Sequence, residues 1–453
     1  MDTICALATA RAAAAIGVIR VSGDDAITIC DKILRLKSGT LFDAKSGVLR
    51  LARVNDGKAD VDEVLCAVFR APHSYTGENM VELNCHGGVS VIDRVMRLII
   101  KNGARTAKGG EFTKRAFLNG KMDLIQAESV ADLINSQSAL DASLALDRMS
   151  GRLSKSFDEI FNTLTDINTD ILAYIDFPEE GLSDVSPETV LSSLSSVHDK
   201  LVKLEKSFDI GSVIKDGANT VILGAPNVGK STLLNAILGY DRSIVSDTAG
   251  TTRDMVTERA VMGEVTLNLC DTAGIREKAG EIEKMGIDIA TRSLDTADLV
   301  FAVFDGSRAL SDDDKKIIDL TKGKTVIAVI NKSDMPKIID EQYISSHFIH
   351  TVNISAANSD GIEKISELVQ TLFETDKISK ESDMLITNTR HFERVCMARQ
   401  KVESAIETIK SGFTPDLASI DITDAASEIG QITGASVADK IIDDIFSKFC
   451  VGK

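Results

Sequence analysis

The first stretch of the chain alternates short apolar runs with a helical segment. Between residues 2 and 118, β-branched runs predict strands, and apolar residues spaced three and four apart predict a helix. The strands are predicted at Ile16–Val21, Val64–Phe69 and Met80–Cys85, and the helix at Val89–Lys101. This mixture predicts a small α+β domain.

The pattern then becomes helical, later mixed, and finally helical again. Apolar residues recur at helical spacing over Met122–Met149, Leu153–Asp176 and Pro187–Ser207. Strands alternating with helices follow, at Thr220–Leu223, Thr266–Cys270, Leu299–Phe304, Thr325–Ile330 and His350–Ile354. Strict alternation predicts a doubly wound α/β domain. Because helical sequence resumes at Arg390, we expect the α/β domain to be inserted into a helical one.

These changes of pattern give a multidomain prediction with four segments. We expect an α+β N-terminal domain at residues 1–118 and the first part of an α-helical domain at 119–210. The α/β domain follows at 211–376, and the second helical part at 377–453. A chain of 453 residues is long enough for several such domains.

Net charge and cysteine content indicate which classes of protein fit this sequence. The formal net charge is −17, from 51 Lys and Arg against 68 Asp and Glu, the opposite of the basic surface typical of nucleic-acid binders. The acidity lies beyond residue 118, since residues 1–118 carry about +4 and the rest about −21. Seven cysteines without a CxxC pair favour a reducing compartment, and we expect a cytoplasmic protein with neither a signal peptide nor a membrane span.

The strongest chemical signal is the string GAPNVGKS at Gly224–Ser231. It matches GxxxxGK[ST] and stands between a predicted strand and a predicted helix, the context of a phosphate-binding P-loop. Its backbone N–H groups would surround phosphate oxygens, Lys230 would neutralise them, and the Ser231 hydroxyl would reach Mg²⁺. The predicted phosphate contacts are Asn227, Val228, Gly229, Lys230, Ser231 and Thr232.

Three further strings indicate guanine rather than adenine. Asp271, Thr272, Ala273 and Gly274 close a strand, where an aspartate can support Mg²⁺ and a glycine amide can approach the γ-phosphate. A Gly/Thr-rich loop holds Ser246, Asp247, Thr248, Ala249, Gly250, Thr251 and Thr252, and Thr252 can complete the Mg²⁺ shell. Asn331, Lys332, Ser333 and Asp334 end a strand, and a carboxylate there accepts from two guanine donors that adenine lacks. Ser355 and Ala356 fit a backbone contact to the guanine oxygen.

One position decides the class of hydrolytic mechanism. Ras-like GTPases place a water-orienting Gln after DxxG, but Ile275 stands there in this chain. Glu283 is the candidate acid for holding the water; the alternative is a solvated helix face. No arginine finger can be assigned. Asn227, with oxygens of the loop from Ser246 to Thr251, could instead hold a monovalent cation against the phosphates.

The order of these strings resembles the MnmE (TrmE) family over nearly the whole chain. Outside the nucleotide motifs, the resemblance rests on DTI at Asp2, GVIRVSG at Gly17–Gly23, SYTGENMVELNCHGG at Ser74–Gly88, GEFTKRAFLNGKMDLIQAE at Gly110–Glu128, IDFPEE at Ile175–Glu180, DTAGTTRD at Asp247–Asp254 and CVGK at Cys450–Lys453. It implies a folate-binding N-terminal domain, a helical domain interrupted by a Ras-like P-loop G domain, and a homodimer formed through the N-terminal domains.

The resemblance also implies an activity and its partners. Members act with the FAD protein MnmG, in a heterotetramer or larger complex, to add an aminomethyl or carboxymethylaminomethyl group at C5 of the wobble uridine (position 34) of certain tRNAs. Their GTPase depends on Mg²⁺ and is stimulated by K⁺ when two G domains meet.

Carried onto this chain residue by residue, the resemblance implies specific roles. Mg²⁺ would be held by Ser231 and Thr252, K⁺ by Asn227, Ser246, Thr248 and Thr251, and the catalytic acid would be Glu283. A 5-formyltetrahydrofolate or another one-carbon tetrahydrofolate would contact Arg20, Glu82, Lys121 and Lys453. Cys450 would have a role in the modification.

The chain departs from the family at one place, and two other functions remain open. Ala10 to Ala15, with Arg11, replace a Pro/Gly-rich stretch before the GVIRVSG strand, and alanine resists the positive φ that glycine allows. One alternative function is an assembly switch of the Era/EngA type, although no RNA-binding KH domain is evident in the sequence. The other is a structural dimer with a vestigial GTPase, which the intact phosphate and magnesium positions disfavour.

Overall fold

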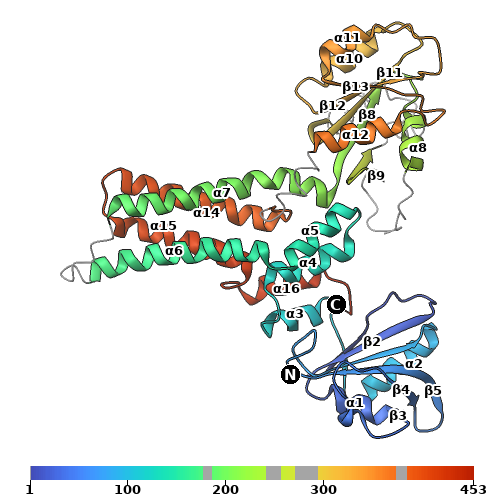
Figure 1. Ribbon diagram of the computed structural model, residues 1–453, viewed down its shortest axis with the longest axis vertical. Helices are drawn as coiled ribbons and strands as arrows, with labels where there is room; N and C mark the ends of the chain where they lie inside the picture. Colours follow the sequence, from blue (N-terminus) through green and yellow to red (C-terminus); the bar gives the residue numbers. More distant parts are fainter. Residues whose placement is uncertain (1, 177–185, 241–256, 271–293, 374–384, 453) are drawn as a thin grey trace, which may run out of the picture. The chain divides into compact units, whose positions relative to one another are not determined.

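The structure is a computed structural model that describes residues 2–176, 186–240, 257–270, 294–373 and 385–452 (Figure 1). The chain forms two compact units. One comprises residues 1–134, 148–197 and 400–453, and the other comprises residues 135–147 and 198–399. None of the helices within the described ranges is both long enough and apolar enough to cross a bilayer.

The first unit contains a seven-stranded sheet in the order β3-β4-β5-β6-β2-β1-β7. Its pairs are antiparallel except for the parallel pair of β1 and β7. The bounds are β1 (Ile4–Leu7), β2 (Ile16–Ser22), β3 (Leu34–Leu36), β4 (Arg50–Asn55), β5 (Asp60–Phe69), β6 (Met80–His86) and β7 (Arg105–Thr106). The three predicted strands are present as β2, β5 and β6, and the predicted helix is α2 (Val89–Lys101).

Alternation along the strands gives this sheet two different faces. Ile19, Val21, Val81 and Leu83 point toward the core beneath α1 (Ala26–Ile33) and α2. The residues between them point to the opposite face, where Arg20 of β2 lies directly across from Glu82 of β6. Part of this opposite face is covered by Phe112 of α3 (Glu111–Leu118), which packs on Ile4 and Ala6.

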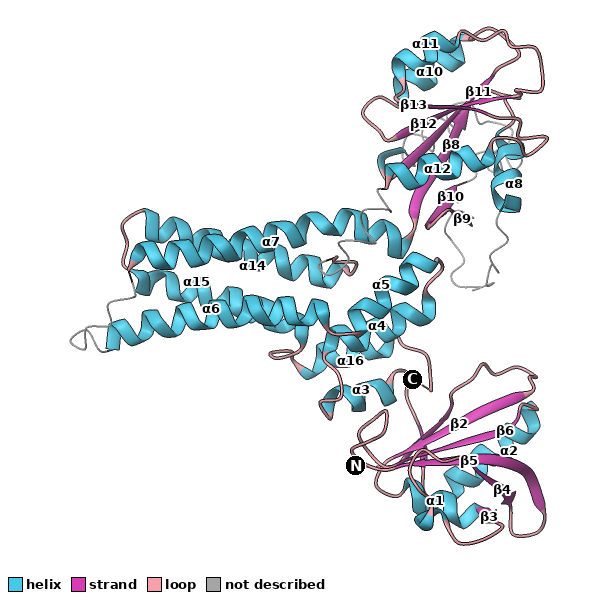
Figure 2. Cartoon of the chain, viewed as in Figure 1, coloured by secondary structure: helices cyan, strands magenta, loops and turns pink. Residues whose placement is uncertain are grey.

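The contiguous helix predicted over Met122–Met149 is wrong in one respect: it is two helices, the first in the first unit and the second largely in the second unit. α4 (Leu124–Asn135) ends before α5 (Ala139–Met149) because the Ser138 hydroxyl accepts from the Asp141 N–H and begins a new helix. α6 (Arg152–Asp176) packs along α15 (Pro415–Thr433), and α16 (Asp439–Ser447) packs on α3 and α4 (Figures 1 and 2).

The second unit contains a six-stranded sheet in the order β13-β12-β11-β8-β10-β9. The strands are β8 (Ala218–Gly224), β9 (Thr257–Met262), β10 (Val265–Cys270), β11 (Leu299–Asp305), β12 (Val326–Asn331) and β13 (His350–Asn353). One core lies beneath α8 (Lys230–Tyr240) and α12 (Ile362–Leu372), and another beneath α10 (Asp312–Leu320) and α11 (Glu341–His347). The sheet is therefore covered on both faces, as a doubly wound domain requires.

The predicted strict alternation of strand and helix is wrong at β9. This strand pairs antiparallel with β10, and Met262 lies across from Val265 in a tight hairpin. Gly263 has φ +65°, a conformation that glycine adopts without strain. The other strands of this sheet are parallel to one another.

Two helices link the units in sequence, α7 (Pro187–Asp216) and α14 (Thr389–Lys410). Within the second unit their side chains meet: the rings of Phe208 and Phe392 stack with centroids 4.2 Å apart, and Arg399 pairs with Glu205. Helices from before and after the α/β region thus pack together (Figure 2). In the first unit α6 packs with α15, and in the second unit the parts of α7 and α14 that it contains meet at these side chains.

Candidate nucleotide site

The P-loop connects β8 to α8 through a tight backbone turn. Asn227 and Gly229 have φ values of 64° and 97°, so the chain curls before the helix begins at Lys230. Lys230 Nζ donates to the carbonyl oxygens of Gly224 and Ala225, each at 2.9 Å, and so lies back over the loop. The first N–H groups of a helix have no intrahelical acceptor, so the start of α8 provides donors for an anion.

Asn331 ties the P-loop to the guanine-recognition segments. Its side-chain Nδ2 donates to the Val228 carbonyl at 2.9 Å, and its Oδ1 accepts from the Ala356 N–H at 2.9 Å. Asn331 is only 2% exposed. Three segments far apart in sequence are therefore fixed against one another by one buried amide.

The residues after β12 are held in a conformation suited to base recognition. Lys332 has φ +66°, and its Nζ pairs with Asp305 at 2.7 Å. The Ser355 hydroxyl donates to Asp334 Oδ1 at 2.6 Å, which orients that carboxylate. The Ala356 N–H, predicted to contact the guanine oxygen, donates here to Asn331, so it would reach a base only by sharing or exchanging this bond.

Asp305 belongs to this site but was missed by the sequence analysis. Burial raises the pKa of its carboxyl group, but hydrogen bonds from Lys332 and Ser307 outweigh that effect and leave the pKa below its usual value. An ionised Asp305 holds the Lys332 side chain in place. The only signal in the sequence is an acidic residue ending the apolar strand β11, which by itself predicts no partner.

Part of the predicted site lies outside the described residues. These positions are Ser246, Asp247, Thr248, Ala249, Gly250, Thr251, Thr252, Asp271, Thr272, Ala273, Gly274 and Glu283. The structure brings together the remaining positions, from Asn227 to Thr232, from Asn331 to Asp334, and at Ser355 and Ala356. Among them, Asn227 and Ser231 are exposed.

A second candidate site lies on the sheet of the first unit. Arg20 binds Glu82 through Nε at 2.9 Å and Nη2 at 2.8 Å, both to Oε1. The guanidinium also lies over the rings of Tyr75 and Phe112, 5.1 and 5.7 Å from their centroids. Arg20 Nη1 is buried without a hydrogen-bond partner among the described residues, so this donor is available to a ligand.

The other two predicted folate contacts are Lys121 and Lys453. Lys121 Nζ donates to the Pro72 carbonyl at 3.1 Å, and Lys453 is outside the described residues. The four residues are therefore not all brought together in the described part of the chain. Of the four, only Arg20 and Glu82 are in contact with each other in the described part of the chain, as a hydrogen-bonded ion pair.

The chain's last described residues are anchored beside α3. The Gly110 N–H donates to the Cys450 carbonyl at 3.2 Å, and Gly109 and Val451 form an antiparallel bridge. A Cβ atom at Gly452 would lie 2.4 Å from the Leu7 carbonyl oxygen, and its φ is +101°. Only glycine allows this close approach. Leu7 belongs to β1, a strand of the sheet that also carries Arg20. Cys450 precedes Gly452 by two residues, so this contact also anchors Cys450.

Cys450 differs from the four cysteines in the core of the first unit. Burial raises the pKa of Cys5 to about 11 and of Cys85 to about 12, and it also raises the pKa values of Cys30 and Cys66. These four thiols are buried, whereas Cys450 is exposed. Reactivity requires an accessible thiolate, so Cys450 is the better candidate for chemistry.

The alanine-rich departure is accommodated without strain. None of Ala10 to Ala15 has a positive φ, and the backbone of Ala14 and Ala15 pairs with Gly87 at 3.2 Å in both directions. A Cβ atom at Gly87 would lie 2.3 Å from the Ala14 carbonyl oxygen. The glycine that this close approach requires is therefore Gly87 in the string NCHGG, and the loop opposite it tolerates alanine.

Comparisons with known proteins identify the family of the chain. A model of the GTP-binding protein TrmE N-terminus matches residues 3–121, and a model of the MnmE helical domain matches residues 124–450. The tRNA modification GTPase MnmE of Acetivibrio thermocellus is 39% identical over 100% of this chain and 99% of its own length. The chain belongs to the MnmE family. The MnmE protein of Thermoanaerobacter pseudethanolicus is 38% identical, with the same coverage.

MnmE membership accounts for the order of the parts found in the structure: an N-terminal α+β region, helices, and a P-loop α/β domain within the helical match. Among solved structures, Aquifex aeolicus Era bound to GDP and AlF₄⁻ is 34% identical over 35% of this chain and 56% of its own, with a TM-score of 0.27. A score that low is not evidence of a shared fold.

Proposed function

We propose that this chain is a GTP hydrolase that acts in tRNA modification, with guanine bound between Asn331, Asp334 and Ser355. The observation that carries the proposal is the buried Asn331 amide, which joins the P-loop to both base-recognition segments. Such a frame would hold a triphosphate and a guanine at fixed separation. The test is hydrolysis by the purified chain: GTP should be cleaved and ATP should not, and equal rates would contradict the proposed guanine pocket.

The chemistry at the γ-phosphate would require cations and a positioned water. We assign Mg²⁺ to Ser231 and Thr252, with support from Asp271; the metal would neutralise charge that develops on the phosphates. Glu283 would orient the attacking water. The intact P-loop supports this assignment, because Lys230 and the start of α8 already supply positive potential at the phosphate position.

We predict that hydrolysis is at least about tenfold faster in KCl than in NaCl at equal ionic strength, since a positioned cation can replace an arginine finger. The exposed Asn227 supports this prediction, together with Ser246, Thr248 and Thr251 as further ligands. Initial rates of phosphate release in the two salts measure it. The Asn227→Ala variant should lose the difference between the salts, and equal wild-type rates would contradict the K⁺ mechanism.

The first unit would bind a one-carbon tetrahydrofolate. The free Arg20 Nη1 suits an anionic or carbonyl oxygen, and the Glu82 carboxylate suits the amino and ring N–H donors of a pterin. Lys121 and Lys453 would attract the glutamate tail. The folate would supply a one-carbon unit for C5 of a wobble uridine, in work shared with the flavoprotein MnmG.

The same unit would form the homodimer. Leu51 and Leu65 lie across from each other on β4 and β5, on the face that points away from the core. They are 41% and 44% exposed, and paired apolar side chains on an open sheet favour burial against another protein surface. A second copy of the chain is the partner that the family resemblance implies.

We predict that Gly452→Ala impairs tRNA modification while leaving GTP hydrolysis within about twofold of wild type. A Cβ atom 2.4 Å from the Leu7 carbonyl, at positive φ, should dislodge the anchored segment and with it Cys450. Modified nucleosides formed in vitro and phosphate release measure the two activities. Gly412→Ala is the control: it also has a positive φ, of +81°, but a Cβ atom there meets nothing within 4 Å. Wild-type modification by Gly452→Ala would contradict a role for the anchored end.

A further inference from the structure

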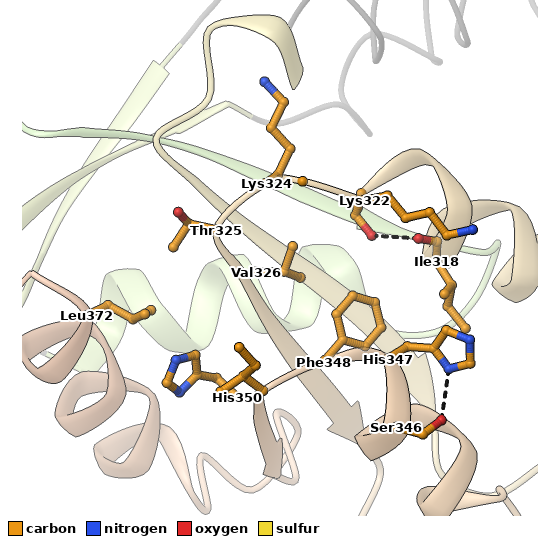
Figure 3. A pocket seen from close by; sticks show the side chains of 13 residues that line it. Ile318, Lys322, Lys324, Thr325, Val326, Ser346, His347, Phe348, His350 and Leu372 are labelled. Carbon is orange, nitrogen blue, oxygen red and sulfur yellow. Dashed lines mark hydrogen bonds between the residues drawn. The ribbon is translucent and has the colours of Figure 1, made fainter.

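The second unit has a pocket of about 550 Å³ whose basic side chains do not converge (Figure 3). Figure 3 shows Lys324 pointing away from Lys322 and His347, and Asp319 pairs with Lys322 at 2.7 Å. A single anionic group would therefore not meet all three basic side chains. In the first unit, by contrast, several buried contacts surround one arginine, Arg20, which has a buried donor to spare.

Two aromatic rings lie against the Arg20 guanidinium. Its Cζ atom is 5.1 Å from the ring centroid of Tyr75 and 5.7 Å from that of Phe112. Tyr75 belongs to the loop between β5 and β6, and Phe112 to the first turn of α3. Because Phe112 is fully buried and Tyr75 is half-buried, the two rings shield much of the guanidinium from water.

The ion pair with Glu82 does not by itself fix the plane of this guanidinium. Arg20 Nε and Nη2 both bind the same oxygen of Glu82, Oε1, at 2.9 and 2.8 Å. Bonds to two carboxylate oxygens hold an arginine in one orientation, whereas two bonds to one oxygen allow it to pivot about that oxygen. The direction in which the remaining nitrogen, Nη1, points therefore depends on what packs against the group.

Helix α3 holds both rings in place. Phe112 and Thr113 are neighbours on this helix, and both are fully buried. The hydroxyl oxygens of Thr113 and Tyr75 are 2.8 Å apart and share a hydrogen bond. Since the hydroxyl lies at the far end of the tyrosine ring from the backbone, the ring is held at both ends.

The loop that carries the tyrosine is fixed as well. The Asn119 side-chain amide donates to the Thr76 carbonyl at 2.7 Å. Arg115 Nη1 donates to both carboxylate oxygens of Glu78 at 3.1 Å, and the Ser22 hydroxyl donates to Glu78 Oε2 at 2.7 Å. Arg115 and Glu78 are buried, and breaking a buried ion pair is strongly destabilising. The loop therefore cannot move away from α3 at low cost.

We propose that Tyr75 is a positioning residue of the folate site: its ring, held by Thr113, keeps the Arg20 guanidinium turned so that Nη1 faces an anionic or carbonyl oxygen of the bound tetrahydrofolate. This inference rests on the folate site proposed above. Tyr75 acts through Arg20 and needs no contact with the ligand. Its effect on binding should consequently require a guanidinium at position 20.

The experiment measures binding of 5-formyltetrahydrofolate to the full chain by isothermal titration calorimetry. Tyr75→Leu removes the ring and should raise Kd by at least about tenfold, as expected for loss of a partly buried cation–π contact. Phe42→Leu, a similar change at an exposed phenylalanine of the same unit, is the matched control and should leave Kd within about twofold. Thermal melting shows whether each variant is folded.

Two conservative variants remove only the hydrogen bond between the ring and α3. Tyr75→Phe and Thr113→Val should each raise Kd by about threefold, and the double variant should raise it no further, because both changes remove the same bond. These variants keep nearly the full side-chain volume, so they test the proposal even if Tyr75→Leu fails to fold.

Repeating the Tyr75 substitutions in an Arg20→Lys chain separates positioning from general support of the domain. Lysine keeps the positive charge, so binding stays measurable, but its ammonium has no plane to orient. Tyr75→Leu should then raise Kd by less than about threefold. A loss equal to that in the Arg20 chain, or an unchanged Kd in Tyr75→Leu with Arg20 present, would overturn the proposal alone. Failure of the wild-type chain to bind the probe would contradict the folate site itself and this inference with it.

Discussion

Replacing Asp334 by asparagine should lower the affinity for GTP by at least about a hundredfold and favour xanthosine triphosphate instead. The carboxylate would accept hydrogen bonds from N1–H and the 2-amino group of guanine, and bonds to a charged acceptor contribute about 1.5–3 kcal/mol each. An asparagine amide presents a donor where guanine also has one. Xanthine carries an oxygen at C2, so the amide N–H₂ can donate to it while Oδ1 accepts from N1–H.

The Asp334→Asn result is measured by titrating GTP and XTP into the variant and following Kd. Ser355 should still donate to Oδ1 of the new amide, so the side chain keeps its orientation. Asp312→Asn, which removes an exposed carboxylate on α10, is the control and should change neither affinity. Unchanged GTP affinity in Asp334→Asn would mean that guanine is recognised elsewhere.

Gly229→Ala should destabilise the second unit and abolish tight GTP binding. The residue has φ +97°, which costs alanine about 1–2 kcal/mol. Its Cβ atom would lie 2.3 Å from Asn331 Nδ2, so the amide must move and break a buried hydrogen bond worth about 1–3 kcal/mol. We expect a loss of about 2–5 kcal/mol in the free energy of unfolding and at least about a hundredfold in GTP affinity.

Gly239→Ala on α8 is the matched control for Gly229→Ala. A Cβ atom there meets nothing within 4 Å, and alanine favours a helix by about 0.5–1 kcal/mol relative to glycine. This variant should bind GTP as wild type does and unfold at slightly higher denaturant concentration. Denaturant unfolding without nucleotide, together with GTP titration, measures both variants. If the two variants had the same stability and the same GTP affinity, the contact between the P-loop and Asn331 would contribute to neither.

Local sequence was sufficient to predict the strand, turn and helix of the P-loop segment. Gly224–Ser231 combines a strand end, a glycine turn and a helix start within a few residues, so its conformation depends on neighbours in the chain. The end of an apolar strand was also sufficient to place Asn331 at the last position of β12 and Asp334 just after it. In the first unit, the period-two alternation of β2 and β6 was sufficient to predict strands, although only the register placed Arg20 across from Glu82.

Features that depend on distant residues were not predictable in this way. Asp305 becomes part of the site only through Lys332, and the hairpin of β9 and β10 depends on pairing that apolar spacing alone did not reveal. The close approach of Gly452 to Leu7 joins the two ends of the chain. Each is a tertiary contact that the analysis of single segments cannot supply.

The most direct test of the central claim is the nucleoside composition of tRNA from cells that lack this chain. Mass spectrometry should show that C5-aminomethyl or carboxymethylaminomethyl groups are lost from wobble uridines. Expression of the wild-type chain should restore them, while Gly229→Ala should not. Unchanged wobble uridines in the deletion strain would contradict the account.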